Sequence, residues 1–300
     1  MGELLGLTSA LMWALTNTFM RVQTARLGAV AVNFWRCLIN IPFFLTLYLL
    51  TRPHDAILQL GWEAILTLLL AVALGLVTGD SLQFHSIKMI GVSRAMPISG
   101  TFPIFTVLFA WLINGDPLRV QMLAGAVVVV LGVLLISLPK RAPAPLGIVA
   151  MPLSSPVQRT LVAGVALSLC AAVCWSLSTV LQGRVLTHSD PVTVNTLRMP
   201  VASLLLFSAT RGQPGRPIRR YGWRAFLLLT GLALLGTGVG SLTYLSALKL
   251  AGAGKTAVLG ACAPLFALPL SMIALGERPG TRGIVGTLLT VVGIVLVVSS

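Results

Sequence analysis

Charged residues are scarce in this chain, and acidic residues are the scarcest. Of its 300 residues, 21 are Lys or Arg and 7 are Asp or Glu, so charged residues make up only 9%. A soluble domain of this length needs more charged side chains to cover its surface. Apolar residues make up 56% of the chain, above the share in ordinary globular domains. This composition excludes a soluble protein and predicts an all-α polytopic membrane protein.

Motifs for metal, redox and hydrolytic chemistry are also missing. The four cysteines all lie inside apolar runs and form no CxxC motif, as packed thiols do: Cys37, Cys170, Cys174 and Cys262. The GAGKT stretch ending at Thr256 resembles a phosphate-binding loop, but Lys249 stands where that motif needs glycine. We therefore expect no metal site, no cofactor and no catalytic residues.

The net charge of +14 does not indicate nucleic-acid binding. The basic residues stand singly or in small groups between apolar runs, as in loops that face the cytoplasm and anionic lipid headgroups. Loops on the same side of the membrane as the N-terminus hold five Lys and Arg residues, and the opposite loops hold fourteen. The positive-inside rule then predicts that both termini lie outside a bacterial inner membrane.

Ten segments are apolar enough to span a membrane, which takes about 20 residues each. They lie at residues 4–22, 31–50, 63–86, 91–113, 120–138, 160–182, 191–209, 223–248, 253–275 and 282–299. The third and eighth are long, so we expect them to tilt or break. A proline-rich stretch at 139–159 divides the chain in half.

The two halves repeat each other at a nearly constant spacing. The matches are Trp13 with Trp175, Asn33 with Asn195 and Arg36 with Arg198 at an offset of 162; Ser81 with Ser241 and Phe84 with Tyr244 at 160; and Lys88 with Lys249, Pro103 with Pro264, Gly125 with Gly286 and Gly132 with Gly293 at 161. An offset that drifts so little indicates a duplication.

Each half holds five spans, and because five is odd the second half enters the membrane from the opposite side. We therefore predict two inverted five-helix repeats around a central cavity, at residues 1–138 and 160–300, with 139–159 as a cytoplasmic linker. Inverted repeats of this kind are typical of alternating-access transporters.

Asp80 is the only acidic residue well inside a predicted span. A carboxylate in the membrane is costly and marks a functional candidate. It could bind a substrate ammonium group or carry a coupling proton, and a structural hydrogen bond to a neighbouring helix explains it equally well. Gln83 and His85 lie nearby, and an interfacial position explains His85 better than a role in transport.

Arginine recurs near the start of the second and seventh spans, as Arg36 and Arg198, each preceded three residues earlier by an asparagine, Asn33 and Asn195. A cation near a helix N-terminus opposes the helix dipole, so an anion or carbonyl groups should lie close by. We interpret these four residues as a gate or a structural network, with substrate contact and snorkelling as alternatives. Inversion of the halves would place Arg36 toward the cytoplasm and Arg198 toward the outside.

Polar and aromatic residues share helix faces that should point inward, since lipid-facing surfaces avoid polar groups. For each of these residues taken individually, a polar contact that joins two helices is an equally good explanation. The predicted cavity-lining residues are Trp13, Asn17, Asp80, Gln83, His85, Trp175, Thr179, Ser241 and Tyr244. Pro103 and Pro264 are candidate hinges, and the glycine-rich fifth and tenth spans are a candidate scaffold.

Several motifs resemble the ten-helix exporters of the drug/metabolite transporter superfamily. They are Asp190-Pro191-Val192-Thr193 with Arg198 and Ala202, Pro103 with Gly115-Asp116, Gln121 and Gly125, and Pro264 with Leu275-Gly276-Glu277 and Gly286. The resemblance covers nearly the whole chain and is nearest to bacterial exporters of amino acids, aromatic ones in particular. It implies a basket of helices around a central cavity and efflux of amino acids. Gly28-Ala29-Val30-Ala31 departs from the proline-led motif that such proteins carry before the second span, which weakens any transfer of a role to Arg36.

The sequence thus predicts an alternating-access inner-membrane exporter of amino acids and related small amphipathic metabolites, and no enzyme. Its expected partners are a small-molecule substrate, membrane lipid and a coupling proton. A proton-coupled multidrug pump, a passive facilitator and a membrane-embedded enzyme acting on a lipid-linked substrate are the alternatives. Neither the substrate range nor the oligomeric state follows from the sequence.

Overall fold

The computed structural model describes residues 1–27, 29–90, 95, 98–137, 156–209, 222–263, 265–266 and 281–300, and all regular elements within them are helices. In the first half these are α1 (Gly2–Leu27), α2 (Ala29–Thr51), α3 (Trp62–Val72), η1 (Ala73–Gly79), α4 (Asp80–Ile90), α6 (Phe102–Phe109), η2 (Ala110–Asn114) and α7 (Val120–Ser137). In the second half they are α8 (Pro156–Leu186), α9 (Pro191–Ala209), α10 (Trp223–Ala233), η4 (Leu234–Val239), α11 (Gly240–Gly260) and α13 (Thr281–Val298).

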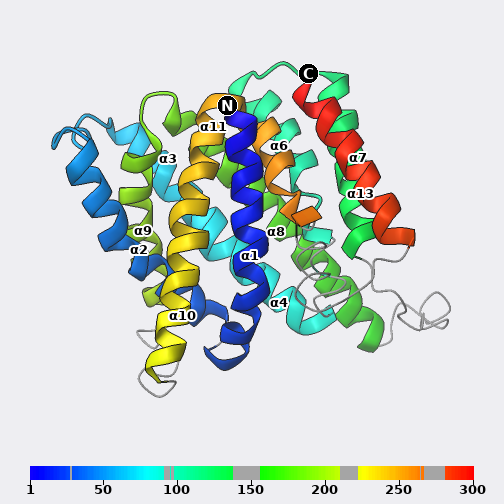
Figure 1. Cartoon of the computed structure of the whole chain (residues 1–300), viewed down its shortest axis with the longest axis horizontal. Helices are drawn as coiled ribbons and strands as arrows, with labels where there is room; N and C mark the ends of the chain where they lie inside the picture. Colours follow the sequence, from blue (N-terminus) through cyan, green and yellow to red (C-terminus); the bar gives the residue numbers. More distant parts are fainter. Residues whose placement is uncertain are drawn as a thin grey trace.

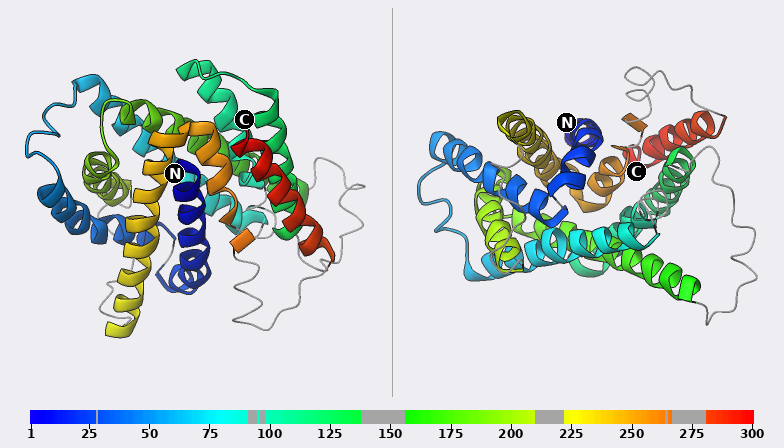
Figure 2. Two further views of the ribbon diagram at one scale, coloured as in Figure 1. Left: turned by 45° about the horizontal axis from the view of Figure 1, so that its top comes forward. Right: turned by 90° about the horizontal axis from the view of Figure 1, so that it is seen from below.

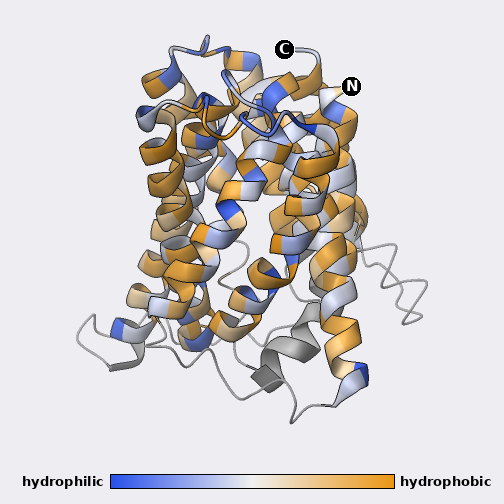
Figure 3. Cartoon of the chain, turned by 90° about the vertical axis from the view of Figure 1, so that its left-hand side faces the viewer, coloured by the Kyte–Doolittle hydropathy of each residue, from blue (hydrophilic) through white to orange (hydrophobic). Residues whose placement is uncertain are grey.

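Long apolar helices dominate the described part of the chain, and both termini lie at the same end of the bundle (Figure 1). Six helices there are long and apolar enough to cross a membrane: Val30–Thr51, Trp62–Ile90, Arg159–Leu186, Pro191–Ala209, Trp223–Gly260 and Thr281–Val298. Hydrophobic residues cover most of the helical surface, and hydrophilic residues are concentrated toward the ends (Figure 3). The protein is therefore an all-helical, multi-pass membrane protein.

The third and eighth predicted spans are both interrupted, each at the matching place. The π-helical turns η1 and η4 start at Ala73 and Leu234. The offset between these two starting residues is 161 (234 minus 73). A π-helical turn inserts one extra residue into an α-helix and often marks a functional site. The eighth and ninth predicted spans meet at Gly252, whose positive φ of 80° breaks the helical path; glycine adopts this conformation without strain.

The boundary between the halves differs from the prediction. Helix α8 begins at Pro156, inside the segment 139–159 that was expected to be a linker. Proline suits the first turn of a helix because its missing N–H needs no partner there. Residues 138–155 lie outside the described part of the chain.

Helices α7 and α13 pack side by side at one edge of the bundle (Figures 1 and 2). A Cβ atom added at Gly125 would lie 3.0 Å from the Gly293 carbonyl oxygen, and one added at Gly132 would lie 2.7 Å from that of Gly286. The contacts run in opposite directions along the two helices, so the helices are antiparallel. Gly125 matches Gly286 and Gly132 matches Gly293, so exchanging the halves reproduces the same pair of contacts, as a two-fold relation requires.

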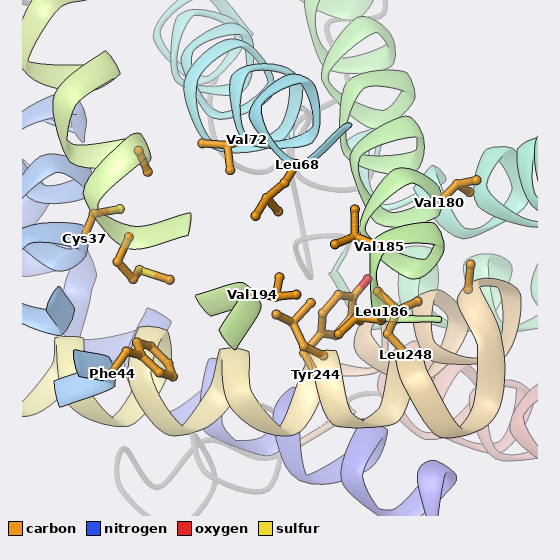
Figure 4. Packing of buried hydrophobic residues seen from close by; sticks show 14 of the residues in the cluster. Cys37, Phe44, Leu68, Val72, Val180, Val185, Leu186, Val194, Tyr244 and Leu248 are labelled. Atoms are coloured by element: carbon orange, nitrogen blue, oxygen red, sulfur yellow. The ribbon is translucent and has the colours of Figure 1, made fainter. Parts of the chain in front are cut away.

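The main hydrophobic cluster joins both halves. Leu68 and Val72 of α3 lie in one cluster with Val180 and Leu186 of α8 and with Tyr244 of α11 (Figure 4). Helices α2 and α9 also contact each other, since the rings of Phe34 and Phe207 are 6.0 Å apart. Contacts between the halves therefore form the centre of the molecule, which is where the polar residues of the candidate site lie.

Candidate functional site

Asp80 is held by two neutral donors, one from each half of the chain. Its Oδ1 accepts a hydrogen bond of 2.9 Å from Trp175 Nε1 of α8. Its Oδ2 accepts one of 3.0 Å from Asn33 Nδ2 of α2. The same Asn33 nitrogen donates to the carbonyl oxygen of Leu76, inside η1, at 3.1 Å. The π-helical turn thus offers a carbonyl group beside the carboxylate, and both are bound from neighbouring helices.

Two arginines lie around this carboxylate. The charges of Arg36 and Arg198 both interact with Asp80 and with each other, yet Asp80 forms an ion pair with neither among the described residues. Three of the four residues predicted as a gate or network, Asn33, Arg36 and Arg198, therefore lie near one carboxylate. That Arg36 and Arg198 face opposite mouths of a cavity stays a prediction.

The two arginines have different partners. Arg36 Nε donates a hydrogen bond of 2.8 Å to Thr237 Oγ1 of η4. The Nε and Nη1 atoms of Arg198 are buried and have no hydrogen-bond partner in the part of the chain that the structure describes. At an offset of 161, Leu76 occupies the position that matches Thr237, so the hydroxyl that serves Arg36 has no counterpart near Arg198.

The second half repeats the asparagine contact with a neutral partner. Ser241 Oγ donates a hydrogen bond of 2.8 Å to Asn195 Oδ1, in the place where Asp80 faces Asn33. Ser241 is therefore the counterpart of Asp80, at an offset of 161. From the sequence alone, Ser241 aligns with Ser81 at an offset of 160. That alignment is wrong by one residue.

The two tryptophans occupy matching positions beside the interrupted helices. A Cβ added at Gly79 would lie 2.8 Å from the Trp175 ring, and one added at Gly240 would lie 3.1 Å from Trp13 Nε1. The absence of a side chain at both glycines is what lets an indole ring approach the helix. The rings bind different acceptors, since Trp175 donates to Asp80 and Trp13 donates to the Gly236 carbonyl at 3.2 Å.

Tyr244 links the aromatic and polar parts of the site. Its ring centroid lies 5.0 Å from that of Trp13, and its hydroxyl lies 3.1 Å from Thr179 Oγ1. Tyr244 also lies close enough to Arg198 for electrostatic interaction. An apolar aromatic surface thus stands next to Arg198, whose Nε and Nη1 have no partner among the described residues.

The other predicted site residues lie elsewhere. Gln83 is buried between α4 and α8, within 3.4 Å of Ser168 Oγ, which suits a contact that joins helices. His85 is exposed, and its Nδ1 lies 2.8 Å from the Ser81 carbonyl oxygen of its own helix. Pro103 is buried in the first turn of α6, where proline is easily accommodated. The Asn17 side chain and Pro264 lie outside the described part of the structure.

Sequence reasoning missed Leu76 and Thr237. Both lie in the π-helical turns, and neither residue type marks such a turn. The signal that could have found them is the pair of glycines that flanks each one, Gly75 and Gly79 in the first half and Gly236 and Gly240 in the second. These glycines align only when the offset is 161.

Comparison with known proteins identifies the family. The sequence model of the EamA-like transporter family matches residues 1–138 and residues 162–299. The chain belongs to the EamA-like transporter family. These two segments begin 161 residues apart, which is the offset of the matching contacts. Membership confirms the resemblance to the drug/metabolite transporter superfamily and identifies the chain as a membrane transporter.

Two individual proteins support this assignment. An uncharacterized transporter from Archaeoglobus fulgidus is 27% identical over 295 residues, which cover 98% of this chain and 96% of the relative. The chain also superposes on a crystal structure of a protein that is 19% identical in sequence, with a TM-score of 0.78. The aligned part covers 98% of this chain and 95% of the other chain. The structural likeness concerns the fold alone. The family and the relative are transporters, so the enzyme alternative is set aside.

Proposed function

We propose that this EamA-like transporter is an alternating-access exporter of amino acids, including aromatic or other apolar ones, and of related small amphipathic metabolites. The observation that carries the proposal is the group of charges around Asp80. A carboxylate and two guanidinium groups lie together between apolar helices, beside the Trp13–Tyr244 ring pair. Charged groups at such a place are costly and are characteristic of substrate or ion pathways.

The proposed architecture has ten spans in two inverted repeats, within residues 1–138 and 160–300. The antiparallel α7–α13 pair and the matching turns η1 and η4 support it. Substrate would bind between the halves and meet alternately the two sides of a bacterial inner membrane, with both termini outside. Pro103 and Pro264 remain proposed hinges.

The proposed pathway residues are Asp80, the residues that bind it or lie near it, and further polar and aromatic residues that the sequence predicts for the cavity, among them Asn17, whose side chain is not described. They are Trp13, Asn17, Asn33, Arg36, Asp80, Trp175, Thr179, Asn195, Arg198, Ser241 and Tyr244. Asp80 would bind a substrate ammonium group or exchange a coupling proton. A proton-coupled multidrug pump uses the same carboxylate, so it is the alternative that this site also supports.

Transport by purified protein in proteoliposomes tests the function. Labelled amino acids from apolar, aromatic, polar and charged classes are followed by uptake and by counterflow, at two pH gradients. We expect saturable counterflow of apolar and aromatic amino acids, and uptake that follows the pH gradient if a proton is coupled. Absence of movement for every amino acid would refute export of amino acids. Efflux of cationic dyes in its place would favour the multidrug pump, and loss of that efflux in Asp80→Asn would assign coupling to Asp80.

A further inference from the structure

Arg198 has a buried guanidinium group whose hydrogen bonds are incomplete in the described part of the chain. Its Nε and Nη1 have no hydrogen-bond partner among the described residues. A buried guanidinium group with unmet hydrogen bonds costs up to several kcal/mol in a low-dielectric interior. Such a group persists where a ligand satisfies it for part of the functional cycle, because unpaired buried polar groups are otherwise rare.

The neighbouring carboxylate does not fill this need. Asp80 is held by Trp175 and Asn33, and it forms no ion pair with Arg198 in the described structure. The charges are near enough to interact but are not joined. A molecule that carries both charges can satisfy both groups at once.

The difference from Arg36 argues against a purely structural role. Arg36 and Arg198 match in sequence, and a structural arginine would need its partner in both halves. Among the described residues, Arg36 Nε has a partner in Thr237, whereas Arg198 Nε has none, and Leu76 stands at the matching position and offers no hydroxyl. The aromatic Tyr244 lies close enough to Arg198 for electrostatic interaction, and its ring packs against that of Trp13, which extends the apolar surface.

We propose that Arg198 is the carboxylate-binding residue of the transport site, and that Asp80 receives a substrate ammonium group beside it. This inference rests on the proposed function and narrows it to zwitterionic substrates with an apolar side chain. The hydrogen bonds to the carboxylate are charge-assisted, which makes them stronger than those between neutral groups. Discrimination against an amine that lacks the carboxylate follows, because that amine leaves the guanidinium unpaired.

Three probes separate the charges: L-phenylalanine has both, phenethylamine has only the ammonium group, and 3-phenylpropionate has only the carboxylate. Binding to the purified full-length protein in detergent is measured by isothermal titration calorimetry. We expect Arg198→Gln to weaken binding of both carboxylates by about 10-fold or more, the effect of losing a hydrogen bond to a charged group. Binding of phenethylamine should change by less than about threefold or become tighter, since a repelling cation is removed.

Two further variants control for folding and for charge. Arg198→Lys keeps the cation without the fixed geometry of the guanidinium group, so it should bind the carboxylates with intermediate affinity. Arg119→Gln removes an exposed arginine that contacts the C-terminal Ser300, and it should bind all three probes as the unaltered protein does. The elution volume in size-exclusion chromatography and the thermal unfolding curve show whether each variant is folded.

The outcomes distinguish this inference from the function on which it rests. Equal weakening of all three probes in folded Arg198→Gln, or unchanged binding of the carboxylates, would overturn the role of Arg198 even if amino acids are transported. If the unaltered protein binds 3-phenylpropionate through Arg198 but not L-phenylalanine, the carboxylate site stands and the amino-acid function falls. If it binds neither carboxylate, the proposed site is wrong.

Discussion

The two halves of this transporter share a scaffold but differ in the chemistry at their centre. In the first half, Asn33 of α2 faces the carboxylate of Asp80. In the second half, Asn195 of α9 faces the hydroxyl of Ser241. The π-helical turn before each of these residues carries Leu76 in one half and Thr237 in the other. The two copies of the repeat therefore differ at two positions. The first half has a carboxylate at Asp80, and the second half has an added hydroxyl at Thr237, where the first half has Leu76.

This difference gives the site its polarity. Thr237 binds Arg36, the arginine of the other half, whereas nothing in the described structure binds the buried nitrogens of Arg198. Two equivalent halves would give both arginines the same partners. The residues at the π-helical turns thus leave Arg36 with a hydroxyl partner and Arg198 with two unpartnered nitrogens in the described structure, near a single carboxylate.

Asp80→Ser makes the first half resemble the second, and it should have the largest effect. Two guanidinium groups lose a carboxylate whose charge acts on both, and an uncompensated buried charge costs roughly 3–5 kcal/mol. We expect initial counterflow rates in proteoliposomes to fall by about 100-fold or more. The matched control is Ser81→Ala, because the Ser81 hydroxyl binds only the Val77 carbonyl of its own helix.

Moving the carboxylate to the other half sharpens this test. The double variant Asp80→Ser/Ser241→Asp should remain inactive, because Trp175 loses its acceptor and Trp13 already binds the Gly236 carbonyl. Restored transport would show that the halves are interchangeable at this position. A transport rate in Asp80→Ser above about a third of the unaltered rate would remove Asp80 from the mechanism.

Much of the fold followed from the sequence, because apolar runs define helices in a membrane. The predicted spans at 120–138 and 191–209 end within one residue of α7 and α9. Asp80 also stood out, since it is the only acidic residue well inside a predicted span. Its partners did not, because Trp175 reaches it only after the two halves have docked.

The turns η1 and η4 explain the part that could not be predicted. A π-helical turn adds a residue to a helix without changing its composition, so apolar periodicity does not reveal it. An error of one residue in the offset then pairs Ser241 with Ser81 and hides its correspondence with Asp80. The contacts with Asn33 and Asn195 reveal the true pairing, and with it the mismatch of Leu76 and Thr237.

Gly132→Ala and Gly293→Ala test the part of the frame that the halves share. A Cβ at Gly132 would lie 2.6 Å from the Thr290 backbone nitrogen, and one at Gly293 would lie 2.7 Å from that of Val129. Since each clash is with backbone, we expect each variant to lose ~1–3 kcal/mol of stability, the usual cost of overpacking. Thermal unfolding in detergent measures the loss, and the two values should agree within about 0.5 kcal/mol.

Gly231→Ala is the control for this pair, because a Cβ there would have no neighbour within 4 Å and alanine favours helix formation. It should unfold at the same temperature as the unaltered protein or slightly higher. Clearly unequal losses for Gly132→Ala and Gly293→Ala would show that α7 and α13 are not related by a two-fold axis.

Leu76→Thr makes the first π-helical turn resemble the second. The new hydroxyl would give Arg198 the kind of partner that Thr237 gives Arg36. We expect affinity for L-phenylalanine to fall by about 10-fold, since a hydrogen bond to a charged group must now be broken for each ligand bound. Calorimetry measures the change, with Leu76→Val as the matched control, which shortens the side chain without adding a hydroxyl. Equal affinities for the two variants would show that Leu76 does not keep Arg198 free.

The end of the bundle near the termini offers the smallest test. There Arg52 Nε lies 2.8 Å from Asp190 Oδ1, and Asp190 also accepts a hydrogen bond of 2.9 Å from the Val192 backbone N–H at the start of α9. The first half has Gly28 at the position matching Asp190, so it has no side chain to cap α2 in this way. Arg52→Gln removes only the ion pair, and Asp190→Ala removes the cap as well.

Stability should therefore fall by less than ~1 kcal/mol in Arg52→Gln and by ~1–2 kcal/mol in Asp190→Ala. Salt separates the two contributions, because about 1 M NaCl screens charges that lie near the surface but leaves a capping hydrogen bond in place. In thermal unfolding, the deficit of Arg52→Gln should shrink at high salt while most of the Asp190→Ala deficit persists. If the two deficits shrink together, Asp190 acts through its charge alone, and the difference between the halves at this end is electrostatic instead of a difference in how α2 and α9 begin.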